Sequence, residues 1–265
     1  MIKLTALPCL CVDVFDGTEE IRPGGEALNF AVHAAGFEEI DVTLLGVVGD
    51  DEYGRAILKA IEDKRIEKKY IRTDRDYVTA NNRTYLTPEG DRYYKEDSWN
   101  GKILDNYRLS EKEEEVLASS EVVFVHFWAS CFQEVLELKK KYSFKLAVDF
   151  DVYRDFEDME QYAPYIDFFM ISGKEELLQH FHAFSQKYEG LFNMSLGDKG
   201  SVTYYRGSEY RVKAKKVDEV VDTTGCGDSY HAGFVCSYLL SGDIEKAMHK
   251  GSELAAETLS HFGGF

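Results

Sequence analysis

The sequence has few positive charges, and this shortage excludes two classes of partner. Its 265 residues include 31 Lys and Arg against 48 Asp and Glu, which gives a formal net charge of −17. Nucleic acids and anionic membranes both require basic protein surface. We therefore expect no nucleic acid and no membrane among the partners of this protein.

Prolines and paired cysteines are scarce as well. Four prolines, no repeat and no low-complexity segment favour a single domain over residues 1–265. None of the five cysteines forms a Cys-x-x-Cys pair, and their number is odd. These features predict reduced thiols in a cytoplasmic protein rather than a disulfide framework or a zinc site. The cysteines are Cys9, Cys11, Cys131, Cys226 and Cys236.

Long hydrophobic runs are also missing. The longest later apolar run, residues 122–132, is too short to span a bilayer. The apolar segment 4–12 soon meets Asp13 and Asp16, and no small-residue cleavage site follows it. We therefore expect this segment to form a buried strand rather than a secretory signal.

Short apolar, β-rich runs alternate with helical patterns along the chain. This alternation predicts an α/β fold with a mostly parallel sheet and helices on both faces. The expected strands are residues 4–14, 42–48, 122–127, 145–150, 168–171, 191–196 and 201–205. The expected helices are residues 28–35, 53–64, 111–118, 131–141, 174–182, 229–241 and 244–260.

Residues 70–102 interrupt the alternation with a strand–turn–strand pattern. A strand is expected over residues 78–87, a turn over Pro88-Glu89-Gly90-Asp91, and a second strand over residues 92–95. The segment is polar and rich in Tyr, Arg and Asn. It is either a hairpin that decorates the sheet or a lid over a ligand pocket.

The most informative segment is residues 222–234, Asp-Thr-Thr-Gly-Cys-Gly-Asp-Ser-Tyr-His-Ala-Gly-Phe. Gly225 and Gly227 flank one small residue, and a helix-compatible run begins at Ser229. A helix N-terminus has unpaired N–H groups and about half a positive charge, so the loop can hold a phosphoryl group. Asp228 would stand beside that group and can accept the proton of an attacking hydroxyl. The segment predicts a small-molecule kinase, with an ordinary strand-to-helix turn as the alternative.

Two other nucleotide-binding motifs are incomplete. Gly49-x-x-x-x-Gly54 is followed by Arg55-Ala56, so the Lys and the Ser or Thr of a Walker A motif are missing. Tyr230 replaces the third glycine of a dinucleotide fingerprint starting at Gly225. We expect neither a P-loop nor a dinucleotide site.

Three segments together resemble the PfkB (ribokinase-like) family of carbohydrate kinases. Residues 222–234 resemble its second signature, with Cys226 in place of the usual alanine. Gly24-Gly25-Glu26-Ala27-Leu28-Asn29 resembles its first signature, and residues 46–54 resemble its Gly-x-x-Gly-x-Asp-x-x-Gly. The resemblance implies a ribokinase-like three-layer sandwich, a sugar substrate, and ATP and Mg²⁺ as cofactors.

The resemblance also assigns a lid and the residues that bind the acceptor. A small β-lid is expected from about residues 11–24 and 70–102, through which a homodimer can form. The residues expected to bind the acceptor are Asp13, Gly24, Gly25, Asn29, Arg83 and Arg92.

The same resemblance assigns the catalytic residues. Asp228 is the expected base, and the N–H groups of Gly225, Cys226 and Gly227 are expected to stabilise the developing charge. His231, one turn further on, is expected to be a helix-face residue rather than a catalyst.

Residues 195–201 resemble a nucleotide-binding segment of the family, and Ser195, Gly197 and Gly200 are the expected contacts. A simple hairpin turn is the alternative. Glu175 is expected near the metal, although Ser172 departs from the family's Asn. Asp149 and Asp151 either organise Mg²⁺ through water or are solvated loop acids.

Within the family, the chain most resembles bacterial fructoselysine 6-kinases. Only ten residues separate Asp13 from Gly24, fewer than a full first lid hairpin needs, which leaves room for a sugar joined to an amino acid. Arg83 and Arg92 either pair with the amino acid's carboxylate or are exposed strand residues. Pro8-Cys9 stands where that subfamily tends to have Gly-Asp.

The resemblance therefore implies phosphorylation of the 6-hydroxyl of a fructosamine. Free fructose, 2-keto-3-deoxygluconate or a nucleoside are alternative acceptors. A sugar-binding protein without catalytic activity is the second alternative.

Overall fold

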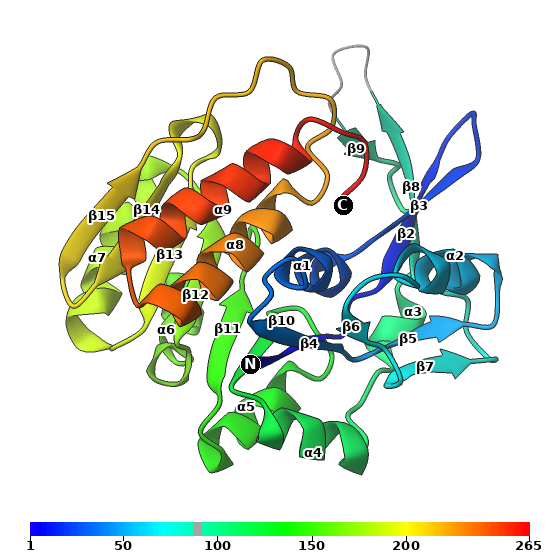
Figure 1. Cartoon of the computed structure of the whole chain (residues 1–265), viewed down its shortest axis with the longest axis horizontal. Coiled ribbons are helices and arrows are strands. Elements are labelled where there is room, and N and C mark those ends of the chain that lie inside the picture. The colour runs from blue at the N-terminus through cyan, green and yellow to red at the C-terminus, as the bar shows by residue number, and fades with distance from the viewer. Residues whose placement is uncertain (87–91) are drawn as a thin grey trace.

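The computed structural model describes residues 1–86 and 92–265, and its centre is one large sheet (Figure 1). The strand order is β15-β14-β13-β12-β11-β10-β1-β4-β6. Neighbours pair in parallel except β13 with β14 and β14 with β15. These strands are β1 (Ile2–Leu7), β4 (Ile40–Leu44), β6 (Ile66–Glu67), β10 (Val122–His126), β11 (Lys145–Asp149), β12 (Phe168–Ser172), β13 (Leu191–Ser195), β14 (Ser201–Tyr205) and β15 (Ser208–Val212).

Helices cover both faces of this sheet. Strand β12 shows the two sides, because neighbouring side chains on a strand point to opposite faces. Phe168 packs on Phe234 of α8, with ring centroids 6.2 Å apart, while Phe169 packs on Phe181 of α7 at 5.4 Å. Helices α1 (Glu26–Ala34), α8 (Cys226–Ser241) and α9 (Ile244–Thr258) lie on one face, and α4 (Glu111–Ser119), α5 (Phe132–Lys141) and α7 (Leu178–Lys187) lie on the other. The predicted three-layer α/β arrangement is confirmed.

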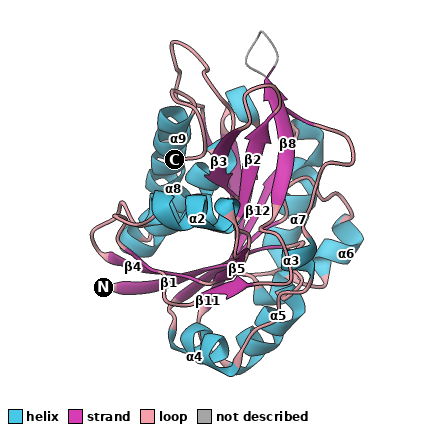
Figure 2. Cartoon of the chain, turned by 90° about the vertical axis from the view of Figure 1, so that its right-hand side faces the viewer, coloured by secondary structure: helices cyan, strands magenta, loops and turns pink. Residues whose placement is uncertain are grey.

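A second sheet, in the order β3-β2-β8-β9, stands across the direction of β1 and β4 (Figure 2). We call it the lid; its strands are β2 (Cys11–Phe15), β3 (Glu20–Gly24), β8 (Asn81–Leu86) and β9 (Arg92–Tyr94). The expectation that Asp13 and Gly24 are too close for a full hairpin was wrong, because β2 and β3 pair along their whole length. The expected turn at 88–91 and the side chain of Arg92 lie outside the described residues, and the dimer through the lid stays a prediction.

Two expected strands are each divided between sheets. Residues 4–14 form β1 and β2, because Pro8 has no N–H with which to continue the ladder. Residues 42–48 form β4 and β5 (Gly46–Gly49), and β5 pairs with β7 (Ile71–Asp74) in a small parallel sheet. A Cβ atom at Gly46 would lie 2.4 Å from a methyl group of Leu10. The glycine therefore lets the segment between β4 and β5 pass close to the segment between β1 and β2.

Several short elements were not predicted. The helix expected at 174–182 begins as a 3₁₀ turn over Glu175–Leu177 and continues as α7 to Lys187. The remaining helices are α2 (Glu52–Ala60), α3 (Lys102–Asp105) and α6 (Phe156–Glu160), with 3₁₀ turns over Ala163–Tyr165 and Gly197–Lys199. Within the described ranges, no helix is long and apolar enough to cross a membrane.

Helices α8 and α9 approach closely through a pair of glycines. A Cβ atom added at Gly233 would lie 2.8 Å from the Cα of Gly251, and one added at Gly251 would lie 2.8 Å from the carbonyl oxygen of Tyr230. The obstructing atoms belong to the backbone and cannot rotate away. Since α8 carries the segment 225–228, this contact also fixes the position of that loop.

We expect Gly233→Ala to destabilise the protein. Alanine gains about 1 kcal/mol of helix propensity over glycine, but forcing a methyl group into a packed interface costs about 1–3 kcal/mol. A lower urea midpoint is the expected result. His249→Ala, on the exposed face of α9, is the control and should leave the midpoint nearly unchanged. A Gly233→Ala midpoint at or above the wild-type value would contradict the packing argument.

Candidate active site

A cleft of about 620 Å³ opens where parallel strands end, between the main sheet and the lid. Ligand sites of α/β proteins commonly lie outside the carboxyl ends of the parallel strands. The sheet contributes residues at the ends of β1, β10, β11 and β12, and the lid contributes residues from β2 and β8. The polar lining residues include Asp13, Glu26, Asn29, Asn82, His126, Asp149, Ser172, Asp228 and His231.

Asp228 and Asn29 meet at the floor of this cleft. Asp228 lies in the first turn of α8, and Asn29, which is buried, lies in the first turn of α1. The Nδ2 of Asn29 donates a 2.8 Å hydrogen bond to Oδ2 of Asp228. Two residues that are 199 positions apart are thereby joined, as expected for neighbours in one active site.

The loop before α8 has the conformation that an anion site needs. Gly225 has φ 71°, a left-handed conformation that favours glycine, and it caps the helix. The buried Asp222 carboxylate accepts hydrogen bonds from the N–H of Thr224 at 2.9 Å and from the N–H of Gly263 at 2.9 Å. The Asp222 carboxylate therefore holds the loop in place, and Gly225 and Gly227 line the cleft.

The three predicted N–H donors are not equivalent. Gly225 and Gly227 line the cleft. The N–H of Cys226 points to the carbonyl oxygen of Thr223 at 3.4 Å, which is long for an N–H···O hydrogen bond. An anion has to compete with this weak contact for the Cys226 N–H.

His231 lies on α8, as expected, and its side chain also lines the cleft. It is buried, and its Nδ1 lies 3.1 Å from Oδ2 of Asp149 at the end of β11. Burial alone would lower the pKa of His231, but the Asp149 carboxylate raises it above the ordinary value. The sequence held one indication that His231 lies near Asp228: it follows Asp228 by three positions and therefore shares its helix face.

Asp228 is a carboxylate in an unfavourable environment. Removal from bulk water raises its pKa well above the ordinary value, and the nearby charge of Glu26 raises it further, while the hydrogen bond from Asn29 opposes both. A raised pKa makes a carboxylate a stronger base, which suits proton abstraction from a hydroxyl.

The expected acceptor-binding residues divide into two groups. Asp13, Gly25 and Asn29 line the cleft, and Thr84 donates a 2.9 Å hydrogen bond to Oδ1 of Asp13. Gly24, at the end of β3, is buried behind Asn29.

Arg83 is not in the first group. It lies on the lid and pairs with Glu19 at 2.7 Å and with Asp16 at 3.4 Å, as an exposed strand residue does. Its proposed contact with a substrate carboxylate, and that of Arg92, stay predictions.

The expected nucleotide-binding residues lie beside the cleft rather than in it. Gly197 and Gly200 form the turn between the antiparallel strands β13 and β14, so the hairpin alternative is confirmed. Ser195 Oγ donates a 3.1 Å hydrogen bond to Oγ of Ser172, which lines the cleft. This contact connects the turn with the cleft, and the nucleotide role stays a prediction.

Glu175, expected near the metal, is exposed and pairs with Arg211 at 3.3 Å. It does not line the cleft, whereas Asp149 and Asp151 do. A metal-binding role for Glu175 would first require this ion pair to open.

The cleft is strongly acidic. Among the described residues, no lysine or arginine lines it. Two tryptophans, Trp99 and Trp128, stand in its wall with about half of each residue exposed, at 51% and 58%. The carboxylates that line it are Asp13, Glu26, Asp105, Asp149, Asp151 and Asp228. Such a cleft attracts cations and offers flat apolar surfaces beside them.

Comparison with known proteins gives a family match over nearly the whole chain. The model of the pfkB family carbohydrate kinases matches residues 16–264. Fructoselysine 6-kinase of Shigella flexneri is 26% identical over 258 residues, covering 96% of this chain and 96% of that protein. Fructosamine kinase FrlD of Bacillus subtilis is 26% identical over 275 residues, covering 100% of this chain and 93% of that protein.

Solved structures share the fold. Adenosine kinase from Sinorhizobium meliloti superimposes with a TM-score of 0.83 at 18% identity, covering 99% of this chain and 95% of that chain. Ribokinase of Arabidopsis thaliana, complexed with ribose and ATP, gives a TM-score of 0.79 at 17% identity, with coverages of 99% and 93%. The ribokinase-like fold predicted from the sequence is confirmed.

We expect Asp228→Asn to stabilise the folded protein at neutral pH. Because folding raises the pKa of Asp228, its ionised form carries a cost in the folded state, and asparagine removes that cost. The gain should be fully present above the raised pKa and vanish as the pH falls below 3.8, where the carboxyl is protonated in both states. Thermal unfolding of both proteins across this pH range is the measurement.

Asp41→Asn serves as the control for that experiment, since it removes one negative charge from an exposed position on β4. It should not reproduce the pH-dependent gain. An Asp228→Asn variant that melts below the wild type at neutral pH would show that the carboxylate is not strained.

Proposed function

Because the chain belongs to the pfkB family of carbohydrate kinases, we propose that it phosphorylates the 6-hydroxyl of a fructosamine such as fructoselysine, with ATP as donor. The protein is a phosphotransferase that acts on a sugar hydroxyl.

The acidity of the cleft is the observation that favours an amine-bearing acceptor. Six carboxylates line it with no lysine or arginine among the described lining residues. A fructosamine carries an ammonium group beside its sugar, and this charge is attracted to such a cleft. An acceptor that carries a carboxylate and no ammonium group, such as 2-keto-3-deoxygluconate, is repelled by it. The relatives named as fructoselysine 6-kinase and fructosamine kinase support the same choice.

The two tryptophans suit the amino-acid part of the acceptor. Trp128 packs edge-on against Tyr153 at 5.2 Å, so its position is fixed although it is largely exposed. An ammonium group gains about 0.5–1 kcal/mol over an aromatic face at an exposed site. Trp99 and Trp128 with the exposed Asp105 therefore offer both an apolar and an ionic contact to a lysine side chain.

The sugar end of the acceptor binds beside the N-termini of α1 and α8 in this proposal. Asp228 accepts the proton of the attacking hydroxyl, and Asn29 holds the carboxylate through its 2.8 Å hydrogen bond. The first-turn N–H groups of α8 stabilise the charge on the transferring phosphoryl group. Orienting the two reactants should contribute more to the rate than proton abstraction itself.

Asp149 and Asp151 fit the donor chemistry of Mg²⁺, which prefers carboxylate and water oxygens. When bound, Mg²⁺ neutralises phosphate charge. The ion pair with His231 holds Asp149 in its position at the cleft.

The acceptor assignment is tested by coupled ADP release with Mg-ATP against fructoselysine, fructose, 2-keto-3-deoxygluconate and a nucleoside. We expect the highest kcat/KM for fructoselysine. Asp105→Asn should raise the KM for fructoselysine more than that for fructose, because only the first carries the ammonium group. Asp41→Asn should change neither KM. Preference for fructose or a nucleoside would overturn the substrate and keep the kinase.

The role of Asp228 is tested separately from the acceptor. Asp228→Asn should lower kcat by about 10²–10⁴-fold, the usual contribution of a positioned base. Binding of ATP, measured by calorimetry, should stay near the wild-type value, since the N–H groups of the loop are unchanged. Turnover within a few-fold of the wild type would contradict the assignment.

A further inference from the structure

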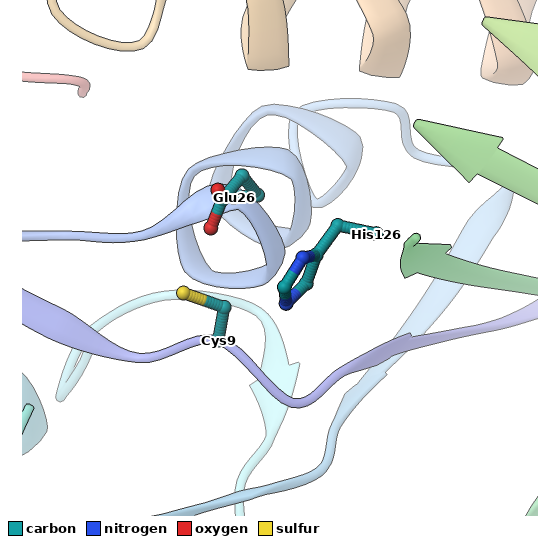
Figure 3. Close-up of side chains that lie close together, drawn as sticks. All are labelled: Cys9, Glu26 and His126. Carbon is teal, nitrogen blue, oxygen red and sulfur yellow. The ribbon is translucent and has the colours of Figure 1, made fainter. Parts of the chain in front are cut away.

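Three side chains with metal-binding atoms converge in the wall of the cleft (Figure 3). Cys9 follows β1, Glu26 begins α1, and His126 ends β10. One sulfur, one carboxylate oxygen and one ring nitrogen all lie within 4.8 Å of one another. The three residues come from three different segments of the chain, and neither Cys9 nor His126 has a role in the proposed phosphoryl transfer.

The backbone brings Cys9 and Glu26 together for a definite reason. Gly25 has φ 106°, and a Cβ atom there would lie 2.7 Å from the carbonyl oxygen of Cys9. The same carbonyl accepts a 3.3 Å hydrogen bond from the N–H of Leu28. The glycine thus lets the first turn of α1 rest directly on the Cys9 backbone, with Glu26 beside the thiol.

His126 supplies an independent observation. Its Nδ1 is buried and has no hydrogen-bond partner within the described chain. Buried polar atoms in folded proteins are nearly always paired, so an unpaired one requires an explanation. A bound ion, together with the ligands around it, is one way to provide the missing partner at this place.

The donor set determines which ion fits. Thiolate, imidazole and carboxylate are together the ligands of zinc and its borderline-soft neighbours, whereas Mg²⁺ and Ca²⁺ take oxygen ligands. Three protein ligands with an open fourth position are the arrangement of exchangeable and catalytic zinc sites. Tetrahedral zinc, with bond lengths of about 2.3 Å to sulfur and about 2.1 Å to nitrogen, places these two donors about 3.6 Å apart. Since the donor atoms lie within 4.8 Å of one another, the side chains would have to move by roughly an ångström to bind the ion.

We propose that Cys9, Glu26 and His126 bind one divalent cation of the zinc class, separate from the magnesium that accompanies ATP. Its fourth position faces the cleft, where water or a polar group of the acceptor completes the coordination. Binding releases the proton of the Cys9 thiol to solvent, and the acidic lining of the cleft attracts the ion.

Cobalt titration tests this site without any assay of activity. Untagged, full-length protein is stripped with a chelator and titrated with Co²⁺ in the absence of nucleotide and sugar. We expect one equivalent of Co²⁺ with thiolate-to-cobalt charge-transfer absorption, displaced by stoichiometric Zn²⁺. The result does not depend on whether the proposed acceptor is correct.

The variants assign the ligands. Cys9→Ser should remove the charge-transfer absorption, and Glu26→Gln or His126→Gln should weaken Co²⁺ binding at least about 10–100-fold, the loss seen even for outer-shell partners. Cys236→Ser, in buried α8, is the matched control and should keep the absorption. Circular dichroism establishes that each variant is folded.

Two results would overturn the proposal. One is a folded wild-type protein that binds Co²⁺ without the charge-transfer absorption. The other is absorption that survives Cys9→Ser but disappears in Cys11→Ser, since Cys11 lies within hydrogen-bonding reach of the Cys9 thiol.

Discussion

The hydrogen bond between Asn29 and Asp228 is the contact around which the cleft is organised. It joins the N-termini of α1 and α8, which come from opposite ends of the chain. The C-terminal segment completes the contact: a Cβ atom at Gly264 would lie 2.5 Å from Oδ1 of Asn29, and one at Gly225 would lie 2.6 Å from the Cα of Gly264. His33 and Gly264 are linked by a 2.8 Å hydrogen bond between Nε2 and the carbonyl oxygen. Little space is left for either helix to shift, so the Asp228 carboxylate and the loop before α8 keep their geometry.

The second constraint is the concentration of negative charge in one cleft. Such an arrangement opposes folding, because like charges repel and several of them are partly removed from water. Only part of this repulsion is offset within the protein, for example where His231 meets Asp149 at 3.1 Å. The negative charge that is not offset can attract cationic ligands, whether an ammonium group, a magnesium ion or a softer metal. Residues that lower stability while serving a ligand are expected at functional sites.

Much of the fold followed from periodicity and glycine placement. The alternation of apolar runs and helices predicted the parallel sheet, and residues 225–228 predicted the turn that starts α8, although this helix begins at Cys226 rather than at Ser229. The expected single strand over residues 4–14 was wrong, because an apolar run does not reveal that its two halves join different sheets. Arg83 was expected either to pair with a substrate carboxylate or to be an exposed strand residue, and in the structure Glu19 and Asp16 pair with it on the lid. Such pairings depend on the register of neighbouring strands, which a local pattern does not contain.

The sequence by itself determined the fold class, the family resemblance and the choice of Asp228 and its glycine loop as the candidate base and anion site, because these depend on short segments whose residues are adjacent. Only the tertiary structure decided which distant groups share the cleft. Cys9, Glu26 and His126 have no recognisable spacing, and the absence of a Cys-x-x-Cys pair argued against a zinc site. They meet because parallel strands end at one edge of the sheet and because Gly25 lets α1 rest on the backbone after β1. Contacts between elements far apart in the chain are set by packing, which no local motif specifies.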